Sequence, residues 1–173
     1  MASIYYTACS LDGFIAGSGH TLDWLLSRDH DPEGPQSFGA FVADVGASVM
    51  GANTYEWLLQ HGGGSATADG PPTWVMTHRT FAPSEGVHFT SDPVPEVHAR
   101  LVEAAGGRNI WLVGGGELVG QFHDVRLLDE VHVQYAPATL GAGMPLLPRR
   151  IDLDLVAMER NRDFMCGQYR VRR

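Results

Sequence analysis

The sequence has 173 residues and a formal net charge of −8, with 44% hydrophobic and 18% charged residues, an ordinary balance for a globular protein. This length fits a single domain spanning residues 1–173. A protein that binds nucleic acids in general needs a basic face to neutralise phosphates, and the acidic balance argues against one. The one basic cluster lies at the end of the chain and comprises Arg160, Arg162, Arg170, Arg172 and Arg173. Arg170 and Arg172 alternate with Tyr169 and Val171, which predicts the solvated edge of a last strand.

Two cysteines, Cys9 and Cys166, are too few for a disulfide framework. The N-terminal residues lack the basic region and long apolar stretch of a secretion signal. No run approaches the roughly 20 apolar residues of a membrane span. We therefore expect reduced thiols, a cytoplasmic location and no association with membranes.

The first part of the chain alternates between strands and helices. β-Branched and aromatic residues predict a strand at Ser3–Ser10, and glycine and aspartate predict a loop at Leu11–Leu26. Helical spacing of apolar residues predicts a helix at Ser37–Val45. A strand at Ser48–Met50 and a helix that is capped by Asn53 or Thr54 and ends at Leu59 are expected next. A glycine- and proline-rich loop is expected at His61–Pro72.

The second part ends in consecutive strands. We expect strands at Thr73–Thr77, Val87–Phe89, Asn109–Val113, Glu130–Ala136, Ile151–Arg160 and Phe164–Val171, and helices at Pro95–Ala105 and Glu117–His123. This order predicts an α/β fold with a mostly parallel central sheet, helices on both faces and an antiparallel C-terminal hairpin.

The strongest chemical signal is the junction between the apolar strand at Asn109–Val113 and the next helix. Gly114, Gly115 and Gly116 follow the strand directly. Backbone without Cβ atoms lets a ligand approach closely, and a helix N-terminus offers N–H groups and the positive end of a dipole. The segment therefore favours an anion site suited to a pyrophosphate. Its spacing differs from the G-x-G-x-x-G dinucleotide fingerprint, because Val119 stands where the third glycine belongs.

Other signals are weaker when taken one at a time. The segment from Met50 to Glu56 is either a second anion site or an ordinary helix start. Thr77, His78 and Arg79 either bind a ribose phosphate or form an exposed strand end. His132 and Gln134 share one face of their strand and either line a pocket or are structural. The histidines show no metal-ligand spacing, so no metal site is expected.

These segments together resemble the dihydrofolate reductase superfamily, and more closely the reductase domain of bacterial riboflavin biosynthesis and its stand-alone relatives. The resemblance rests on Ser10–Ala16, Met50–Glu56, Val113–Leu118, Asp129–His132 and Ala136–Gly143, which occur in the family's order. It implies a three-layer dihydrofolate-reductase-like fold, with a mostly parallel sheet of about eight strands and flanking helices. It also implies NADPH as cofactor, bound across the C-terminal ends of the parallel strands.

The resemblance implies roles for individual residues. The expected cofactor-binding residues are Ala8, Ile15 and Ala16 around the nicotinamide; Gly51, Asn53 and Thr54 at the phosphates of the other half; Thr77, His78 and Arg79 at the adenosine 2′-phosphate; and Val113, Gly114, Gly115, Gly116, Glu117 and Leu118 at the pyrophosphate. Residues 12–24 would form a mobile loop that closes over the cofactor.

Two departures from the riboflavin reductase pattern concern the substrate. Phe14 stands where a basic residue is usual, and Gly114 where a glutamate is usual. The acid that dihydrofolate reductases carry on the first helix also has no clear equivalent, since only Asp44 is present there. We take Asp12 and Asp23 as candidate proton donors, and Trp24, His132 and Gln134 as candidate substrate-binding residues.

The sequence thus predicts an NADPH-dependent reductase of a pterin-like or pyrimidine-like small molecule, similar to 5-amino-6-(5-phosphoribosylamino)uracil reductase. Two alternatives stay open: an authentic dihydrofolate reductase, and a nucleotide-binding protein that has lost its catalytic activity. The family also implies a homodimer.

Overall fold

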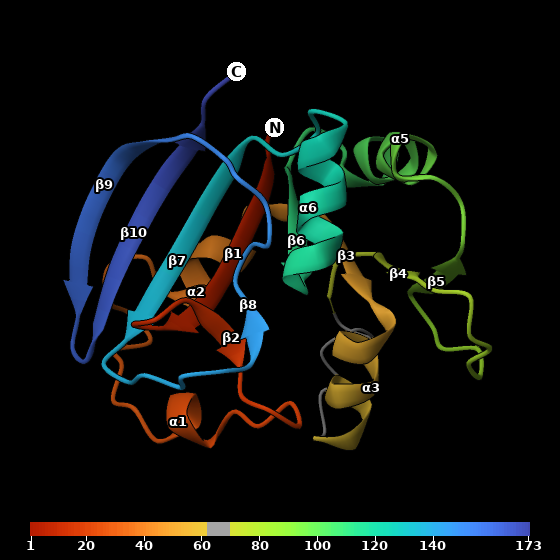
Figure 1. The fold of residues 1–173 in the computed structure, drawn as a ribbon. Coiled ribbons are helices and arrows are strands. Elements are labelled where there is room, and N and C mark those ends of the chain that lie inside the picture. Colours follow the sequence, from red (N-terminus) through yellow and green to blue (C-terminus); the bar gives the residue numbers. More distant parts are fainter. Residues whose placement is uncertain (62–69) are drawn as a thin grey trace.

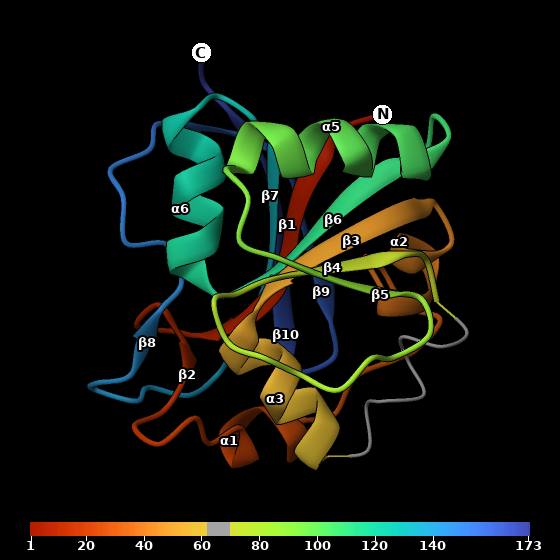
Figure 2. The same cartoon turned by 90° about the vertical axis from the view of Figure 1, so that its right-hand side faces the viewer.

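The computed structural model describes residues 1–61 and 70–173. An eight-stranded sheet forms its centre (Figures 1 and 2). In spatial order the strands are β5 (Val87–Thr90), β4 (Thr73–Met76), β3 (Val45–Gly51), β6 (Asn109–Gly114), β1 (Ser3–Ser10), β7 (Glu130–Ala136), β10 (Phe164–Val171) and β9 (Leu153–Asn161). The six strands from β5 to β7 run parallel, whereas β10 is antiparallel to both β7 and β9. The predicted topology is confirmed.

Helices cover both faces of the sheet. They are α1 (Asp23–Leu26), α2 (Phe38–Val42), α3 (Ala52–Gln60), α5 (Val94–Ala105) and α6 (Gly116–Asp124). One face of the sheet packs on the apolar sides of α5 and α6, where Leu101, Val119 and Phe122 are fully buried. The other face is covered by α2, whose Phe38 and Phe41 contact Trp111 of β6. Helices thus shield both faces of the parallel part of the sheet from solvent, as parallel sheets require.

Most predicted elements are confirmed, several of them with small differences at their ends. The helix expected at Ser37–Val45 ends at Val42, because the chain already enters β3 at the fully buried Val45. Neither Asn53 nor Thr54 caps α3; Gly51 occupies the N-cap position, and no side chain accepts a hydrogen bond there. The loop expected at His61–Pro72 lies largely outside the described residues.

The structure contains a second, two-stranded sheet that was not predicted from the sequence. Within the loop expected at Leu11–Leu26, β2 (Phe14–Ala16) pairs antiparallel with β8 (Met144–Pro145). Gly143 explains why the two segments approach closely, since a Cβ atom there would lie 2.1 Å from the carbonyl oxygen of Ala16. This pairing fixes the loop after β1 beside the start of α6 (Figure 1).

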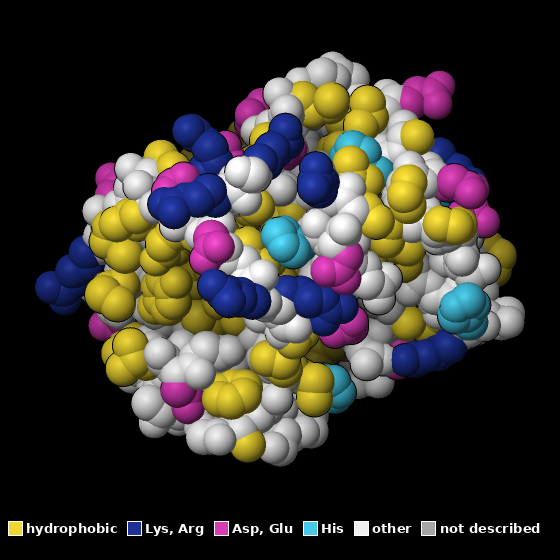
Figure 3. Space-filling view, turned by 45° about the horizontal axis from the view of Figure 1, so that its top comes forward, with side chains coloured by type: hydrophobic (Ala, Val, Ile, Leu, Met, Phe, Trp, Pro, Cys, Tyr) yellow, Lys and Arg dark blue, Asp and Glu magenta, His cyan; other side chains and the backbone are white. Residues whose placement is uncertain are grey.

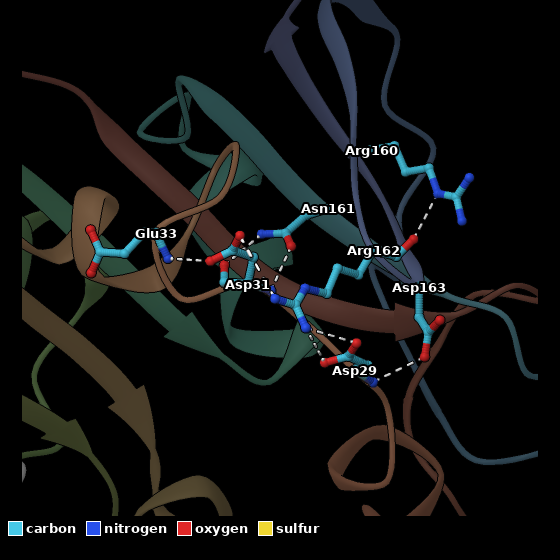
Figure 4. A network of polar contacts seen from close by, with 7 residues as sticks. All are labelled: Asp29, Asp31, Glu33, Arg160, Asn161, Arg162 and Asp163. Atoms are coloured by element: carbon cyan, nitrogen blue, oxygen red, sulfur yellow. Dashed lines mark hydrogen bonds and ion pairs between the residues drawn. The ribbon is translucent and has the colours of Figure 1, made fainter.

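The turn between β9 and β10 anchors the segment that joins α1 to α2 (Figure 4). The side chain of Asn161 accepts a hydrogen bond from Asp31 N–H (2.8 Å) and donates to the carbonyl oxygens of Asp31 and Pro35. Arg162 pairs with the carboxylate of Asp29 at 2.9 Å. Asn161 is only 4% exposed, and its buried polar atoms are satisfied by these hydrogen bonds, which hold a long irregular segment in place.

Candidate functional site

A cavity of about 830 Å³ opens at the carboxyl ends of the parallel strands β1, β3, β4 and β6. The segment around β2 and β8 forms one wall, and the first turns of α3 and α6 form others. Ligands of open α/β sheets bind at this edge, because the strand ends leave a crevice there. The fold therefore places the cavity where a cofactor is expected.

Every residue that was predicted to bind the cofactor lines this one cavity. They are Ala8, Ile15, Ala16, Gly51, Asn53, Thr54, Thr77, His78, Arg79, Val113, Gly114, Gly115, Gly116, Glu117 and Leu118. These residues come from five separate segments of the chain, and only the folded sheet brings them together. The cavity runs from Ala8 at the end of β1 to Arg79 after β4.

The three successive glycines each answer a different requirement. Gly114 has φ +127°, a conformation that other residues rarely adopt. Gly116 packs against the 145–146 backbone, and a Cβ atom there would lie 2.4 Å from the carbonyl oxygen of Leu146. At Gly115 a Cβ atom would meet only Ile15, at 3.7 Å. Gly115 thus leaves open space on the cavity side, at the N-cap of α6.

The α6 N-terminus supplies partial positive charge to the cavity. Glu117 in the first turn would oppose an anion there, but Arg149 binds its carboxylate at 2.7 Å and also reaches Asp124 at 3.1 Å. The hydrogen bond from Arg149 lowers the pKa of Glu117. The guanidinium is shared by two carboxylates, so it offsets part of the negative charge that Glu117 places beside the helix end.

The far end of the cavity is formed by Thr77, His78 and Arg79 after β4. The Thr77 hydroxyl accepts a hydrogen bond from the Arg79 backbone N–H at 2.9 Å. The Arg79 guanidinium contacts the carboxylate of Glu56 at 2.6 Å and also donates to the side-chain oxygen of Asn53. Both partners of Arg79 come from α3, so the helix and the strand end meet at this point.

A smaller cavity of about 430 Å³ adjoins the first, between α3 and the segment around α1. His20, Leu22, Asn53 and Trp57 line both cavities. The candidate proton donor Asp23 lines the smaller one. The sequence did not single out His20 or Trp57; on α3 the helical spacing of Asn53, Glu56, Trp57 and Gln60 is the only signal that could have shown this wall.

Asp12, the other candidate donor, is not brought to either cavity. Its carboxylate accepts hydrogen bonds from the Ser10 hydroxyl (2.6 Å) and from the backbone N–H groups of Leu140 and Gly141. The bonds from Ser10 and Gly141 are the main causes that lower its pKa. The structure therefore gives Asp12 the role of an ionised anchor that joins two loops.

The three candidate substrate-binding residues also lie away from the cavities. Trp24 packs against the small core of Ala136, Phe164 and Cys166. His132 and Gln134 do share one face of β7, but that face is the one beneath α2. His132 pairs with Glu130 at 2.9 Å, and Gln134 donates to the Gln36 carbonyl oxygen at 2.8 Å.

Further sequence expectations concern charges and thiols. Cys9 and Cys166 are both buried and free in the structure, and the reduced state of the thiols stays a prediction. Arg172 and Arg173 pair with Asp154 and Asp129. Figure 3 shows basic and acidic side chains interspersed on the face that it presents. Among residues 1–61 and 70–173, no three His, Cys, Asp or Glu side chains gather as a metal site requires. Over the same residues, no helix is long and apolar enough to cross a membrane.

The sheet order and the cavity at its edge define an α/β protein of the dihydrofolate-reductase-like fold. The family model of the RibD C-terminal domain matches residues 3–161, and the chain belongs to this family.

Individual relatives agree with this assignment. The chain is similar to the uncharacterized protein YwjB of Bacillus subtilis, with 31% identity over 152 residues, 83% of this chain and 81% of the relative. A putative riboflavin biosynthesis protein from Shewanella has TM-score 0.80 and 27% identity, with complete coverage of both chains. A diaminohydroxyphosphoribosylaminopyrimidine deaminase/5-amino-6-(5-phosphoribosylamino)uracil reductase from Thermotoga maritima shares the fold at TM-score 0.64 and 14% identity, over 98% of this chain and 56% of its own.

We predict that Asp12→Ala lowers the melting temperature, because two loops lose the carboxylate that joins them. The folded-state pKa of Asp12 lies below the ordinary value of 3.8. Its contribution is therefore present above pH 3.8 and is lost as the pH falls through the folded-state pKa. Thermal unfolding of both proteins between pH 7 and pH 3 measures this difference.

Glu103→Ala on the exposed face of α5 provides the control, since it removes a carboxylate that lies far from these loops. A melting-temperature difference between wild type and Asp12→Ala that stays constant down to pH 3 would contradict the anchoring role.

Proposed function

We propose that this chain is an NADPH-dependent reductase of a pterin-like or pyrimidine-like heterocycle. The observation that carries the proposal is the single cavity that collects the cofactor residues implied by the family, from Ala8 to Arg79. Membership of the RibD C-terminal domain family supports a reductase over other uses of such a cavity. The Thermotoga maritima protein is a 5-amino-6-(5-phosphoribosylamino)uracil reductase by name, and this name supplies the substrate class for the proposal.

The residues present fit the cofactor in charge and in shape. Gly115 leaves room for a pyrophosphate beside the helix α6, whose N-terminal N–H groups suit an anion. Thr77 and Arg79 supply a hydroxyl and a guanidinium for the 2′-phosphate, and Ile15 and Ala16 form an apolar wall for the nicotinamide. The bound cofactor supplies a hydride; the protein binds, orients and excludes water around the reacting atoms.

We place the substrate in the smaller cavity, because it opens onto the larger one and shares four lining residues with it. Trp57 offers an aromatic surface against which a flat ring can pack. His20 and Gln60 offer hydrogen-bonding groups for its polar edge. In this proposal Trp57, His20 and Gln60 take the substrate-binding role that was expected of Trp24, His132 and Gln134, because the contacts of those three residues lie elsewhere.

Asp23 is the proton donor of this proposal. Reduction of a C=N or C=O bond needs a proton as well as a hydride, and Asp23 is the candidate acid that lines the substrate cavity. Asp23 lies in the first turn of the short helix α1, which follows the loop that carries β2.

We predict that Gly115→Asp strongly weakens NADPH binding, because it places a carboxylate where the pyrophosphate should lie. Repulsion between the two anions should weaken the affinity at least about tenfold. Nicotinamide fluorescence during titration of the purified protein measures the affinity. Gly115→Ala is the matched control: its Cβ atom has only an ordinary contact with Ile15, so this variant should keep the fold.

Wild-type protein that binds no NADPH, or binding that Gly115→Asp leaves unchanged, would refute the cofactor site. NADPH binding without turnover of any pterin or pyrimidine would instead identify a nucleotide-binding protein that has lost its catalytic activity.

We predict that Asp23→Asn lowers kcat about a hundredfold while NADPH affinity stays the same, because only proton transfer is lost. The assay is NADPH oxidation with 5-amino-6-(5-phosphoribosylamino)uracil, and with dihydrofolate to test the dihydrofolate reductase alternative. Asp12→Ala serves as comparison, since its carboxylate lies outside both cavities. Equal kcat values for wild type and Asp23→Asn would remove Asp23 from the mechanism.

A homodimer is also part of the proposal. The edge strand β9 and its neighbour β10 expose large apolar side chains, and Leu155, Met158 and Met165 share one face by their register. Figure 3 shows hydrophobic side chains gathered on the side of the molecule where β9 and β10 lie. An exposed apolar patch on an edge strand is typical of an interface.

We predict that the wild-type protein sediments as a dimer and that Leu155→Arg together with Met158→Arg yields the 18.8 kDa monomer. Two buried guanidinium groups without partners would oppose association. Val125→Arg, at an equally exposed apolar residue after α6, should leave the dimer intact. A wild-type protein that is monomeric at all concentrations would refute this interface.

A further inference from the structure

Among the described residues that line the larger cavity, Arg79 is the one arginine, and none is a lysine. The whole sequence contains no lysine, so all 12 basic residues are arginines. Under the proposed function this single guanidinium must recognise the 2′-phosphate of the cofactor. Its electrostatic surroundings therefore decide how strongly the site distinguishes NADPH from NADH.

Glu56 forms an ion pair with the guanidinium that a 2′-phosphate would have to contact. The carboxylate of Glu56 lies 2.6 Å from the Arg79 guanidinium, and the Asn53 side-chain oxygen accepts from the same group. The Arg79 and Glu56 side chains are 49% and 43% exposed; Arg79 lines the larger cavity, and Glu56 lines the adjoining smaller one. A 2′-phosphate placed here gains the attraction of Arg79 but meets the repulsion of Glu56.

A free ribose hydroxyl meets the opposite balance at the same place. In dinucleotide sites an acidic side chain accepts a hydrogen bond from the 2′-hydroxyl of NADH, whereas an arginine accommodates the 2′-phosphate of NADPH. Here both kinds of side chain are present and paired with each other. The pair offers a carboxylate acceptor to one nucleotide and a guanidinium donor to the other.

We propose that Glu56 is a specificity-determining residue that reduces the preference for NADPH, so that the protein binds and uses both NADPH and NADH. This inference rests on the proposed function, since it requires a nicotinamide nucleotide in the larger cavity. It goes beyond that function by assigning selectivity to a residue of α3 outside the larger cavity's lining.

The alternative is that the Glu56–Arg79 pair only stabilises the fold. Exposed ion pairs contribute little to stability. If the pair had only a structural role, a change at Glu56 would leave the nucleotide selectivity unchanged. The chain offers a matched control for this alternative. Asp92 pairs with Arg100 at the same 2.6 Å and with similar exposure, on the segment before α5 and outside both cavities.

The experiment measures dissociation constants for NADPH and NADH by nicotinamide fluorescence in four proteins: wild type, Glu56→Gln, Arg79→Gln and Asp92→Asn. Glutamine keeps the shape of Glu56 and removes its charge. We expect the wild type to prefer NADPH by less than about tenfold, and Glu56→Gln to raise that preference by about tenfold through tighter NADPH binding. Arg79→Gln should reverse the preference, and Asp92→Asn should leave it unchanged.

The outcomes separate this inference from the proposed function. A wild type that binds neither nucleotide refutes the proposed function, and the inference falls with it. Binding of both nucleotides with the same ratio in wild type and Glu56→Gln refutes the inference alone. A ratio that changes equally in Asp92→Asn would refute it too, because the effect would then be one of net charge.

Discussion

The close contact between the start of α6 and the segment around β8 is the constraint on which the site depends. Gly116 lies so near the carbonyl oxygens of Pro145 and Leu146 that any Cβ atom would clash. The same segment carries β8, which pairs with β2 in the loop after β1. One short approach of two backbones therefore sets the distance between the glycine turn, the helix end and the loop wall of the cavity.

Charge is distributed so that an acidic protein can still receive an anion. The chain has net charge −8, yet the cavity lining includes the N-terminal N–H groups of α6 and the guanidinium of Arg79, which suit an anion. Arg149 offsets the carboxylate of Glu117 beside the helix end. At the other end Glu56 forms an ion pair with Arg79, and the described lining residues of the larger cavity include no second arginine or lysine to offset the charge of Glu56. The two ends of the cavity thus differ in how favourable they are for phosphate.

The C-terminal hairpin serves the site from a distance. The turn between β9 and β10 holds the irregular segment around Asp31 through Asn161 and Arg162 (Figure 4). That segment joins α1, which borders the smaller cavity, to α2, which covers the face of the sheet opposite to α5 and α6. Fixing the segment limits how far the α1 wall can move, so the hairpin contributes to the shape of the smaller cavity.

The sequence by itself determined the elements whose signals are local. The boundaries of the strands Ser3–Ser10, Glu130–Ala136 and Phe164–Val171 follow from apolar runs that end at turn residues, and the structure confirms them. The helix α5 ends at Gly106 with φ +57°, as a glycine after an apolar stripe predicts. The residues expected to bind the cofactor lie in short motifs near strand ends, and the structure shows that they line one cavity.

Only the tertiary structure decided what depends on contacts between distant segments. Strand alternation showed that His132 and Gln134 share a face, but which face is buried under α2 is settled by packing. Asp12 reads as a candidate acid until its loop meets Leu140 and Gly141 from the far end of the chain. The pairing of Glu56 with Arg79 likewise joins a helix to a strand end, and no local pattern encodes it.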